Sequence, residues 1–144
     1  MGTDLFGFKL NYNTVGHSGT PLFNGNIAES EWKTANTDSN LKWYRYGYDH
    51  LNRITSATAN SSNYNVSGIS YDKNGNITNL TRRGAINSTS TSFGEMDKLT
   101  YFYDSGNKLR IVSDAGNDTY GFKDDYIGTS TDTSTDYTYD GNGN

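Results

Sequence analysis

A nine-residue phrase recurs along this chain, and it limits the possible folds more than any other feature of the sequence. Its clearest copy is residues 46–54, Tyr-Gly-Tyr-Asp-His-Leu-Asn-Arg-Ile. Tyrosine at every second position is typical of a β-strand, in which alternate side chains point to opposite faces. Asp and Asn then favour a chain reversal, because their side chains bond nearby backbone groups and tolerate left-handed conformations. The phrase therefore predicts a strand, a tight turn and the start of a second strand.

Four copies of the phrase carry similar residues at the same offsets from an aspartate. A tyrosine precedes the aspartate, and an apolar-bodied residue lies two positions before that tyrosine. Asn or Gly follows the aspartate by three positions, and Ile or Leu follows it by five wherever the chain continues that far. This agreement is more than shared composition would produce. The motif residues are Tyr46, Tyr48, Asp49, Ile54, Tyr71, Asp72, Gly75, Ile77, Tyr101, Tyr103, Asp104, Leu109, Tyr137, Tyr139 and Asp140.

The spacing of the copies predicts how they are arranged. The four aspartates are separated by 23, 32 and 36 residues. Unequal spacing is expected of hairpins whose connecting loops differ in length, whereas a solenoid repeats at a constant period. We therefore predict an all-β fold, with consecutive antiparallel hairpins forming an extended twisted sheet. Residues 1–144 would make up a single repeat region.

The composition indicates a sheet with an unusually thin aliphatic core. Leu, Ile, Val and Phe together number 24 of 144 residues, below the fifth that ordinary folded domains exceed, yet the net charge is only −4. The 12 Tyr and 2 Trp residues supply the missing apolar mass, and aromatic cross-strand pairs contribute roughly 0.2–1 kcal/mol each. One sheet with so few apolar residues should leave a face or an edge exposed. We expect the chain to self-associate through it.

The N-terminal third predicts two further strands outside the four copies. Residues 5–12 are predicted to form a first strand, because apolar residues alternate from Phe6 to Tyr12. Asn24-Gly25 lies between apolar residues and predicts a hairpin turn, with residues 27–32 as the returning strand and a helical turn over residues 28–32 as the weaker alternative. In that strand Glu29 and Glu31 are expected to face water.

The motif also carries a family resemblance. The phrases Tyr-x-Tyr-Asp-x-x-Asn-Arg-Ile at residues 46–54 and Tyr-Asp-x-Asn-Gly-Asn-Ile at residues 71–77 resemble the YD repeat of the RHS (rearrangement hot spot) family, and the resemblance covers residues 5–144. Relatives in this family build long strips of hairpins that spiral into a hollow shell. In bacterial toxin systems the shell encloses a toxic C-terminal domain, and the teneurin adhesion proteins carry a related shell.

This resemblance implies a function and a location. It implies a non-enzymatic scaffold whose partners are the rest of its own shell and an enclosed, toxin-like C-terminal domain. The parent protein would be secreted or exposed at the cell surface. The family's autoproteolytic aspartate-proline site is missing, because the only proline, Pro21, follows Thr20. The chain also stops within its fourth copy, so we expect it to be a fragment of a larger protein.

The sequence offers few candidates for catalysis or metal binding. The recurring aspartates suggest paired acid and base groups, but one aspartate at the same place in every hairpin is better explained as a turn residue. An EF-hand needs Gly at position 6 and Glu at position 12; after Asp72 the Gly falls at position 4 and Arg83 stands at position 12. His17 and His50 have no Cys or second His at ligand spacing. We expect no catalytic residue, cofactor or metal.

The tyrosine-rich faces leave one alternative to a scaffold. Tyr and Trp rings on a sheet face can stack on sugars, so an extracellular module that binds glycan or a protein partner is the second hypothesis. The competing interpretation is that the rings stack on one another across strands and stabilise the sheet. A pI near 5.0 argues against a nucleic-acid partner, and no apolar run is long enough for membrane insertion.

Overall fold

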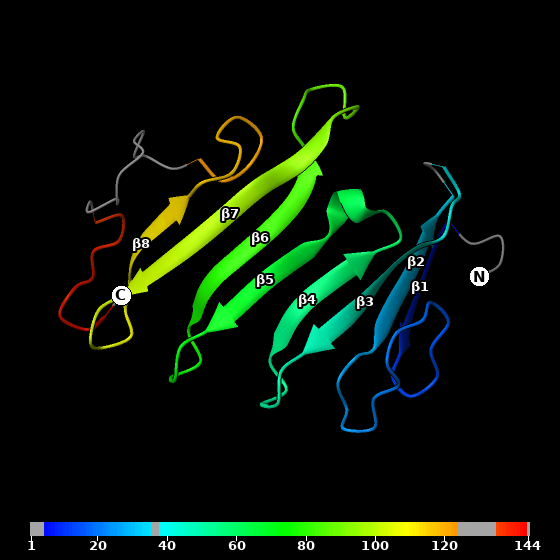
Figure 1. Cartoon of the computed structure of the whole chain (residues 1–144), viewed down its shortest axis with the longest axis horizontal. Coiled ribbons are helices and arrows are strands. Elements are labelled where there is room, and N and C mark those ends of the chain that lie inside the picture. The colour runs from blue at the N-terminus through cyan, green and yellow to red at the C-terminus, as the bar shows by residue number, and fades with distance from the viewer. Residues whose placement is uncertain (1–4, 36–37, 124–134, 144) are drawn as a thin grey trace. The chain divides into compact units, whose positions relative to one another are not determined.

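The chain is an all-β protein made of consecutive antiparallel hairpins, as predicted. The computed structural model describes residues 5–35, 38–123 and 135–143. In these ranges there are eight strands, each hydrogen-bonded to its neighbour in sequence in the order β1 to β8, and a single 3₁₀ turn. The chain divides into two compact units, residues 1–67 and 68–144. Figure 1 shows the strands of both units, coloured from the N-terminus to the C-terminus.

The two units hold the following elements. The first contains β1 (Phe6–Asn11), β2 (Glu29–Thr34), β3 (Lys42–Tyr48), β4 (Ile54–Ala59) and the 3₁₀ turn η1 (Ser62–Tyr64). β5 (Val66–Tyr71) begins in this unit, where Val66 pairs with Ala57. The second contains the rest of β5, β6 (Ile77–Ala85), β7 (Phe93–Tyr103) and β8 (Leu109–Asp114).

Alternation along the strands gives the β1–β4 sheet one aromatic face and one polar face. Tyr44 lies opposite Ser30 on β2 and Ala59 on β4, so these three residues share a face. The register places the following residues on this aromatic face: Phe6, Phe8, Leu10, Trp32, Tyr44 and Tyr46. It places the following on the polar face: Lys9, Asn11, Glu29, Glu31, Trp43 and Arg45.

Part of the aromatic face is open to solvent at strand β1. Phe6 and Phe8 are 59% and 58% exposed, and Leu5, just before the strand, is 78% exposed. The core of the described chain is correspondingly small, and its buried apolar residues are Ala28, Ala57, Ala59, Ile69 and Val112. An exposed apolar face is what a sheet with so few aliphatic residues is expected to leave.

Residues 12–28 differ from the prediction. Asn24-Gly25 does form a turn, with Gly25 at φ +90°, but it does not join two paired strands. The strand that pairs with β2 is β1, with Asn11 opposite Glu29. The predicted hairpin was wrong because the alternating β1 offers a longer partner than the short apolar segment around Pro21, whose proline has no N–H to donate.

The expectation that Glu29 and Glu31 face water was also wrong. Glu29 is 0% exposed and Glu31 is 8% exposed. Both lie on the polar face of the sheet, but residues 16–19 fold over that face and cover them. A strand pattern identifies which residues share a face, whereas burial of that face depends on what packs against it.

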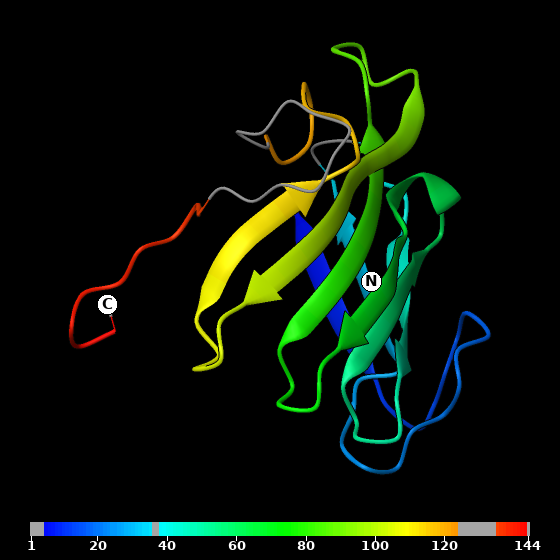
Figure 2. The same cartoon turned by 60° about the vertical axis from the view of Figure 1, so that its left-hand side comes forward.

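The fourth copy of the motif is not a strand. Residues 135–143 run alongside β8, beyond it in both Figure 1 and Figure 2. The backbone N–H of Asp136 donates to the carbonyl of Arg110 at 2.9 Å. The next bond comes from a side chain, because Asp136 Oδ2 accepts the N–H of Val112 at 2.7 Å. A carboxylate thus replaces the carbonyl that would have continued a regular ladder.

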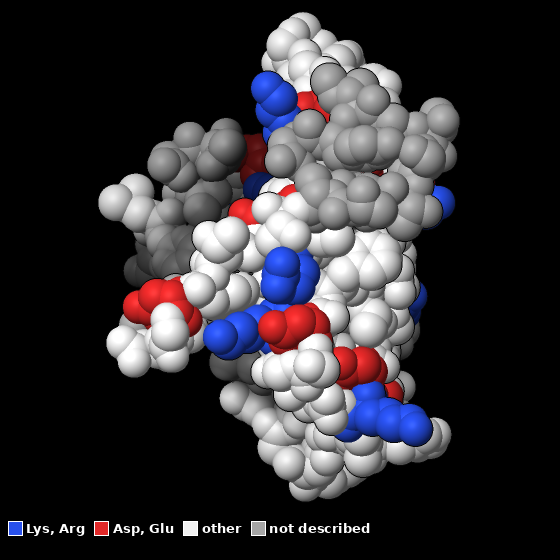
Figure 3. All heavy atoms as spheres, turned by 90° about the vertical axis from the view of Figure 1, so that its left-hand side faces the viewer, with Lys and Arg blue, Asp and Glu red and all other residues white. Residues whose placement is uncertain are grey.

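Charged groups of both signs are mixed on the face of the molecule that Figure 3 shows. On this face, Lys and Arg side chains lie next to Asp and Glu side chains and do not gather into separate patches. In the described part of the chain, no helix is long and apolar enough to cross a membrane.

Candidate functional site

The motif aspartates occupy turns with almost identical hydrogen bonds. In each turn Oδ1 accepts the backbone N–H groups two and four residues later, at 2.8–2.9 Å, for Asp49, Asp72 and Asp104. The residue three positions after the aspartate has a left-handed backbone, with φ of 62° to 92° at Asn52, Gly75 and Asn107. This is the geometry of a three-residue hairpin loop with a bulge, in which Asn and Gly are favoured. Asp140 likewise accepts the N–H of Asn142 at 2.9 Å.

These bonds keep the aspartates ionised and leave them poorly suited to acid–base chemistry. The pKa of Asp49 is lowered chiefly by its backbone hydrogen bond from Arg53. The pKa of Asp72 is lowered chiefly by the side-chain amide of Asn76, and that of Asp104 chiefly by the backbone N–H of Lys108. A general acid needs a pKa close to the working pH. Each carboxylate instead fixes its own turn.

The lowered pKa values predict how acid destabilises the chain. A carboxyl group whose pKa is lower in the folded state stabilises the fold above its unfolded pKa of about 3.9, and this contribution is lost as pH falls further. We expect the melting temperature to decrease as the pH is lowered below about 4. The triple variant Asp49→Asn, Asp72→Asn, Asp104→Asn should show a smaller drop between pH 7 and pH 3, measured by circular dichroism. An equally large drop in the triple variant would show that other groups control acid stability.

The motif tyrosines bond each hairpin to the one before it. In three copies the hydroxyl of the tyrosine preceding the aspartate donates to a backbone carbonyl, at 2.9 Å each time. The accepting residue is the aliphatic one that follows the preceding turn. The three bonds run from Tyr48 to Ile27, from Tyr103 to Ile77 and from Tyr139 to Leu109. The tyrosine of one hairpin and the backbone carbonyl of the aliphatic residue in the preceding hairpin therefore form one contact between the two hairpins.

Asparagine side chains form a second link between turns. In the second unit the amide nitrogens of Asn74 and Asn76 both donate to Oδ1 of Asn107, at 2.6 and 3.0 Å. In the first unit the same pattern joins the turn at residues 24–26 to Asn52, at 2.7 and 3.2 Å. The left-handed Asn of one turn is thus the acceptor for two amides of the preceding turn.

Residues 24–27 are therefore a further half-copy of the motif, which alignment on the aspartates missed. They read Asn-Gly-Asn-Ile, identical to residues 74–77. The position equivalent to Asp72 is Leu22, so a search based on aspartate passes over it. The identical tetrapeptide was the signal that could have found it.

The aromatic rings stack less regularly than the sequence suggested. Trp32 and Tyr44 stack across β2 and β3, with ring centroids 5.7 Å apart, while Tyr44 and Tyr46 stack along a single strand at 6.3 Å. Burial raises the pKa of Tyr48, Tyr101 and Tyr103. Packing within the sheet is thus shared between stacked rings and hydroxyl groups that bond to the backbone.

The hydroxyl bond of Tyr103 can be tested without disturbing its ring. Tyr103→Phe removes the bond to the Ile77 carbonyl and should lower the free energy of unfolding by about 0.5–1.5 kcal/mol. Urea denaturation followed by circular dichroism measures this change. Tyr120→Phe is the control, because Tyr120 is 41% exposed and a surface change should fall within about 0.5 kcal/mol. Equal effects of the two variants would contradict a role for the hydroxyl.

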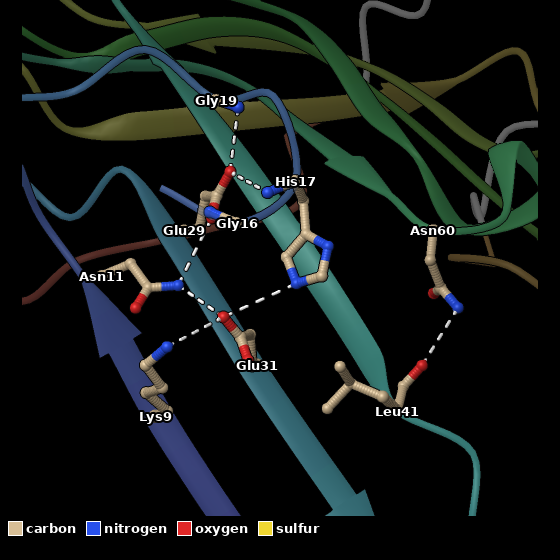
Figure 4. Close-up of polar contacts among 9 residues, drawn as sticks. All are labelled: Lys9, Asn11, Gly16, His17, Gly19, Glu29, Glu31, Leu41 and Asn60. Atoms are coloured by element: carbon tan, nitrogen blue, oxygen red, sulfur yellow. Dashed lines mark hydrogen bonds and ion pairs between the residues drawn. The ribbon is translucent and has the colours of Figure 1, made fainter. Parts of the chain in front are cut away.

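A buried carboxylate lies outside the motif, on the polar face of the first unit. Oε1 of Glu29 accepts the backbone N–H groups of His17 and Gly19 at 2.9 and 2.8 Å, and Oε2 accepts that of Gly16 at 2.7 Å. The Asn11 amide adds a longer bond of 3.3 Å. Burial alone would raise the pKa of Glu29, but these hydrogen bonds lower it overall. Figure 4 shows the loop backbone closing over this side chain.

His17 and Glu31 complete a polar cluster around Glu29. The Nε2 atom of His17 lies 3.5 Å from Oε1 of Glu31, which also accepts the Asn11 amide at 2.5 Å. The imidazole ring stacks on Trp43, with centroids 4.7 Å apart and planes inclined by 8°. His50, the other histidine, lies in the exposed turn after Asp49. The sequence placed His17 in a loop but did not reveal its contact with two buried carboxylates.

The cluster has the residue types of a metal site but not its bonding. One imidazole and two carboxylates, with candidate ligand atoms within 4.8 Å of one another, could in principle hold a divalent cation. Both oxygens of Glu29 already accept two hydrogen bonds each, mostly from the backbone. A cation would have to displace several of these hydrogen bonds before it could bind a Glu29 oxygen. The arrangement fits a structural network that fastens residues 16–19 to β2.

A scan against protein-family models found no match, and a search of curated protein sequences found none either.

Proposed function

We propose that the chain is a non-enzymatic structural scaffold, a stretch of an RHS/YD-repeat shell that encloses or presents a C-terminal domain. The observation that supports this most strongly is the recurring bond from a motif tyrosine to the carbonyl of the preceding hairpin, at 2.9 Å in three copies. Through this contact, each hairpin offers a backbone carbonyl to which the tyrosine of the next hairpin can bond. That is the requirement for a long sheet of successive hairpins.

The chemistry of the motif residues supports the scaffold over an enzyme. The Oδ1 atom of each aspartate accepts backbone N–H groups of its own turn. The lowered pKa values of these aspartates disfavour proton donation. The left-handed asparagines accept amides from the neighbouring turn. The recurring aspartates and turn asparagines thus have partners within the chain itself.

Three further features are proposed because the motif resembles the YD repeat of the RHS family. These are the toxin-like nature of the enclosed domain, a secreted or cell-surface parent protein, and the remaining hairpins of the shell as partners. Self-association through the exposed β1 face belongs to the same proposal, because in a shell that edge would be covered by another hairpin.

Electron microscopy of the complete natural polypeptide that contains these residues tests the proposal directly. The expected result is a hollow particle with protein density inside it, and protection of the enclosed domain from added protease. The combined variant Tyr48→Phe and Tyr103→Phe should increase access of protease to that domain, whereas Tyr120→Phe should not. A particle without an interior cavity would contradict the scaffold function.

A further inference from the structure

A groove lies at one end of the first unit, where β2 ends, β3 begins and β4 ends. Its volume is about 540 Å³, within the range of small-ligand sites. Aromatic and small apolar residues form its floor, and two short segments form its walls, one before β3 and one around η1. The lining residues are Trp32, Asp38, Asn40, Lys42, Tyr44, Ala59, Asn60, Ser61 and Tyr64.

The aromatic part of the groove is held in place by internal bonds. Trp32 and Tyr44 stack with their planes inclined by only 15°. The Tyr44 hydroxyl donates to the backbone carbonyl of Tyr64 at 2.8 Å, which ties the floor to the η1 wall. Tyr64 itself is 47% exposed. The groove therefore presents aromatic surface without needing to rearrange.

The rim of the groove is polar but carries no uncompensated charge. Lys42 Nζ lies 2.8 Å from Asp38 Oδ1, so the two charges of the lining neutralise each other. Asn40 and Asn60 are both exposed. Within the described residues, the Asn60 amide makes one long hydrogen bond, 3.5 Å to the Leu41 carbonyl (Figure 4). Side-chain amides of this kind can both donate to and accept from a ligand.

We propose that this groove binds a neutral saccharide of one or two rings. Sugar rings have an apolar C–H face that packs on aromatic rings, and hydroxyl groups that donate and accept at their edges. An aromatic floor edged by amides, a hydroxyl and an internally neutralised ion pair complements both. An anionic glycan would be repelled by Asp38, whose charge is already paired with the only cation among the described lining residues, Lys42. An apolar peptide would bury the side-chain amides of the rim without offering them hydrogen-bond partners, which is unfavourable. This inference does not depend on the scaffold proposal.

A glycan array probed with the purified 144-residue chain identifies the ligand class, and tryptophan fluorescence then measures the affinity. Trp43→Phe leaves Trp32 as the sole tryptophan, so quenching or a blue shift on titration with a neutral oligosaccharide reports on the groove. Tyr64→Ala should weaken binding at least tenfold. Asn60→Ala should weaken it roughly two- to tenfold, the effect of one hydrogen bond.

Asn13→Ala is the matched control, because Asn13 is exposed and follows β1 at the opposite end of the sheet. It should leave both affinity and melting temperature unchanged. The melting temperature of every variant is measured, and Asn60→Ala covers the case in which Tyr64→Ala fails to fold. A folded chain that binds no neutral glycan, or that binds one with unchanged affinity in Asn60→Ala, overturns the proposal. Selective binding of acidic glycans or of peptides at the groove overturns it equally.

Discussion

Replacing Glu29 with alanine is expected to lower the free energy of unfolding by about 3–5 kcal/mol, because three backbone N–H groups lose at once the charged acceptor that fixes their loop. Glu29 is fully buried, and it accepts the backbone N–H groups of Gly16, His17 and Gly19. These donors belong to the loop that covers the Glu29 side chain. Residues 16–19 should therefore detach from β2 in the variant.

Two measurements separate this effect from a general loss of stability. Chemical denaturation gives its size, and hydrogen exchange should locate the loss of protection in residues 12–34. Glu95→Ala is the control, because Glu95 is exposed on β7 and its removal should change stability by no more than about 0.5 kcal/mol. Glu29→Gln, which keeps one acceptor oxygen, should fall between the two. Equal stability of Glu29→Ala and Glu95→Ala would show that the carboxylate does not hold the loop.

Asp97→Ala is expected to have the largest effect in the second unit, about 2–4 kcal/mol. Asp97 is 3% exposed. One carboxylate oxygen pairs with the guanidinium of Arg82, and the other accepts the backbone N–H of Phe122 at 2.7 Å. Asp97 thus fastens the segment after β8 to β7, as Glu29 fastens a loop to β2.

The matched control for Asp97 is Asp118→Ala, since Asp118 is an exposed carboxylate in the same segment. Gly121→Ala probes the same contact by a different route, because a Cβ there would collide with the Met96 carbonyl oxygen and with Asp97. Both Asp97→Ala and Gly121→Ala should expose residues 115–122 to hydrogen exchange. If only Gly121→Ala does so, the segment is held by close packing and not by the carboxylate.

The sequence predicted the repeated hairpins because their bonds are local. The turn at Asp49 closes within five residues, through Oδ1 and the N–H groups of Leu51 and Arg53. The strand before it alternates at a period that only a sheet satisfies. The positions of the strands and turns could therefore be predicted from short stretches of sequence, and the structure agrees with them at β3 and β4 and at β7 and β8.

The contacts between hairpins could not be predicted in the same way. Asn74 and Asn107 are 33 residues apart in sequence, and the bond between them exists only once two turns lie side by side. The burial of Glu29 also depends on the tertiary structure. By sequence Glu29 is a strand glutamate on a polar face, and nothing near it marks it as buried. A loop twelve residues distant supplies the N–H donors that make burial of its charge possible.

The recurring motif thus determined by itself the hairpins of its first three copies, since period-two alternation and turn hydrogen bonds act over a few residues. Only the tertiary structure decided which polar groups became the anchors of each unit. It also decided that Trp32, Tyr44 and Tyr64 line one groove. The physical reason is the same in both cases. A residue is buried, and its hydrogen bonds are satisfied, by whatever packs against it in the fold, and those partners can come from distant parts of the sequence.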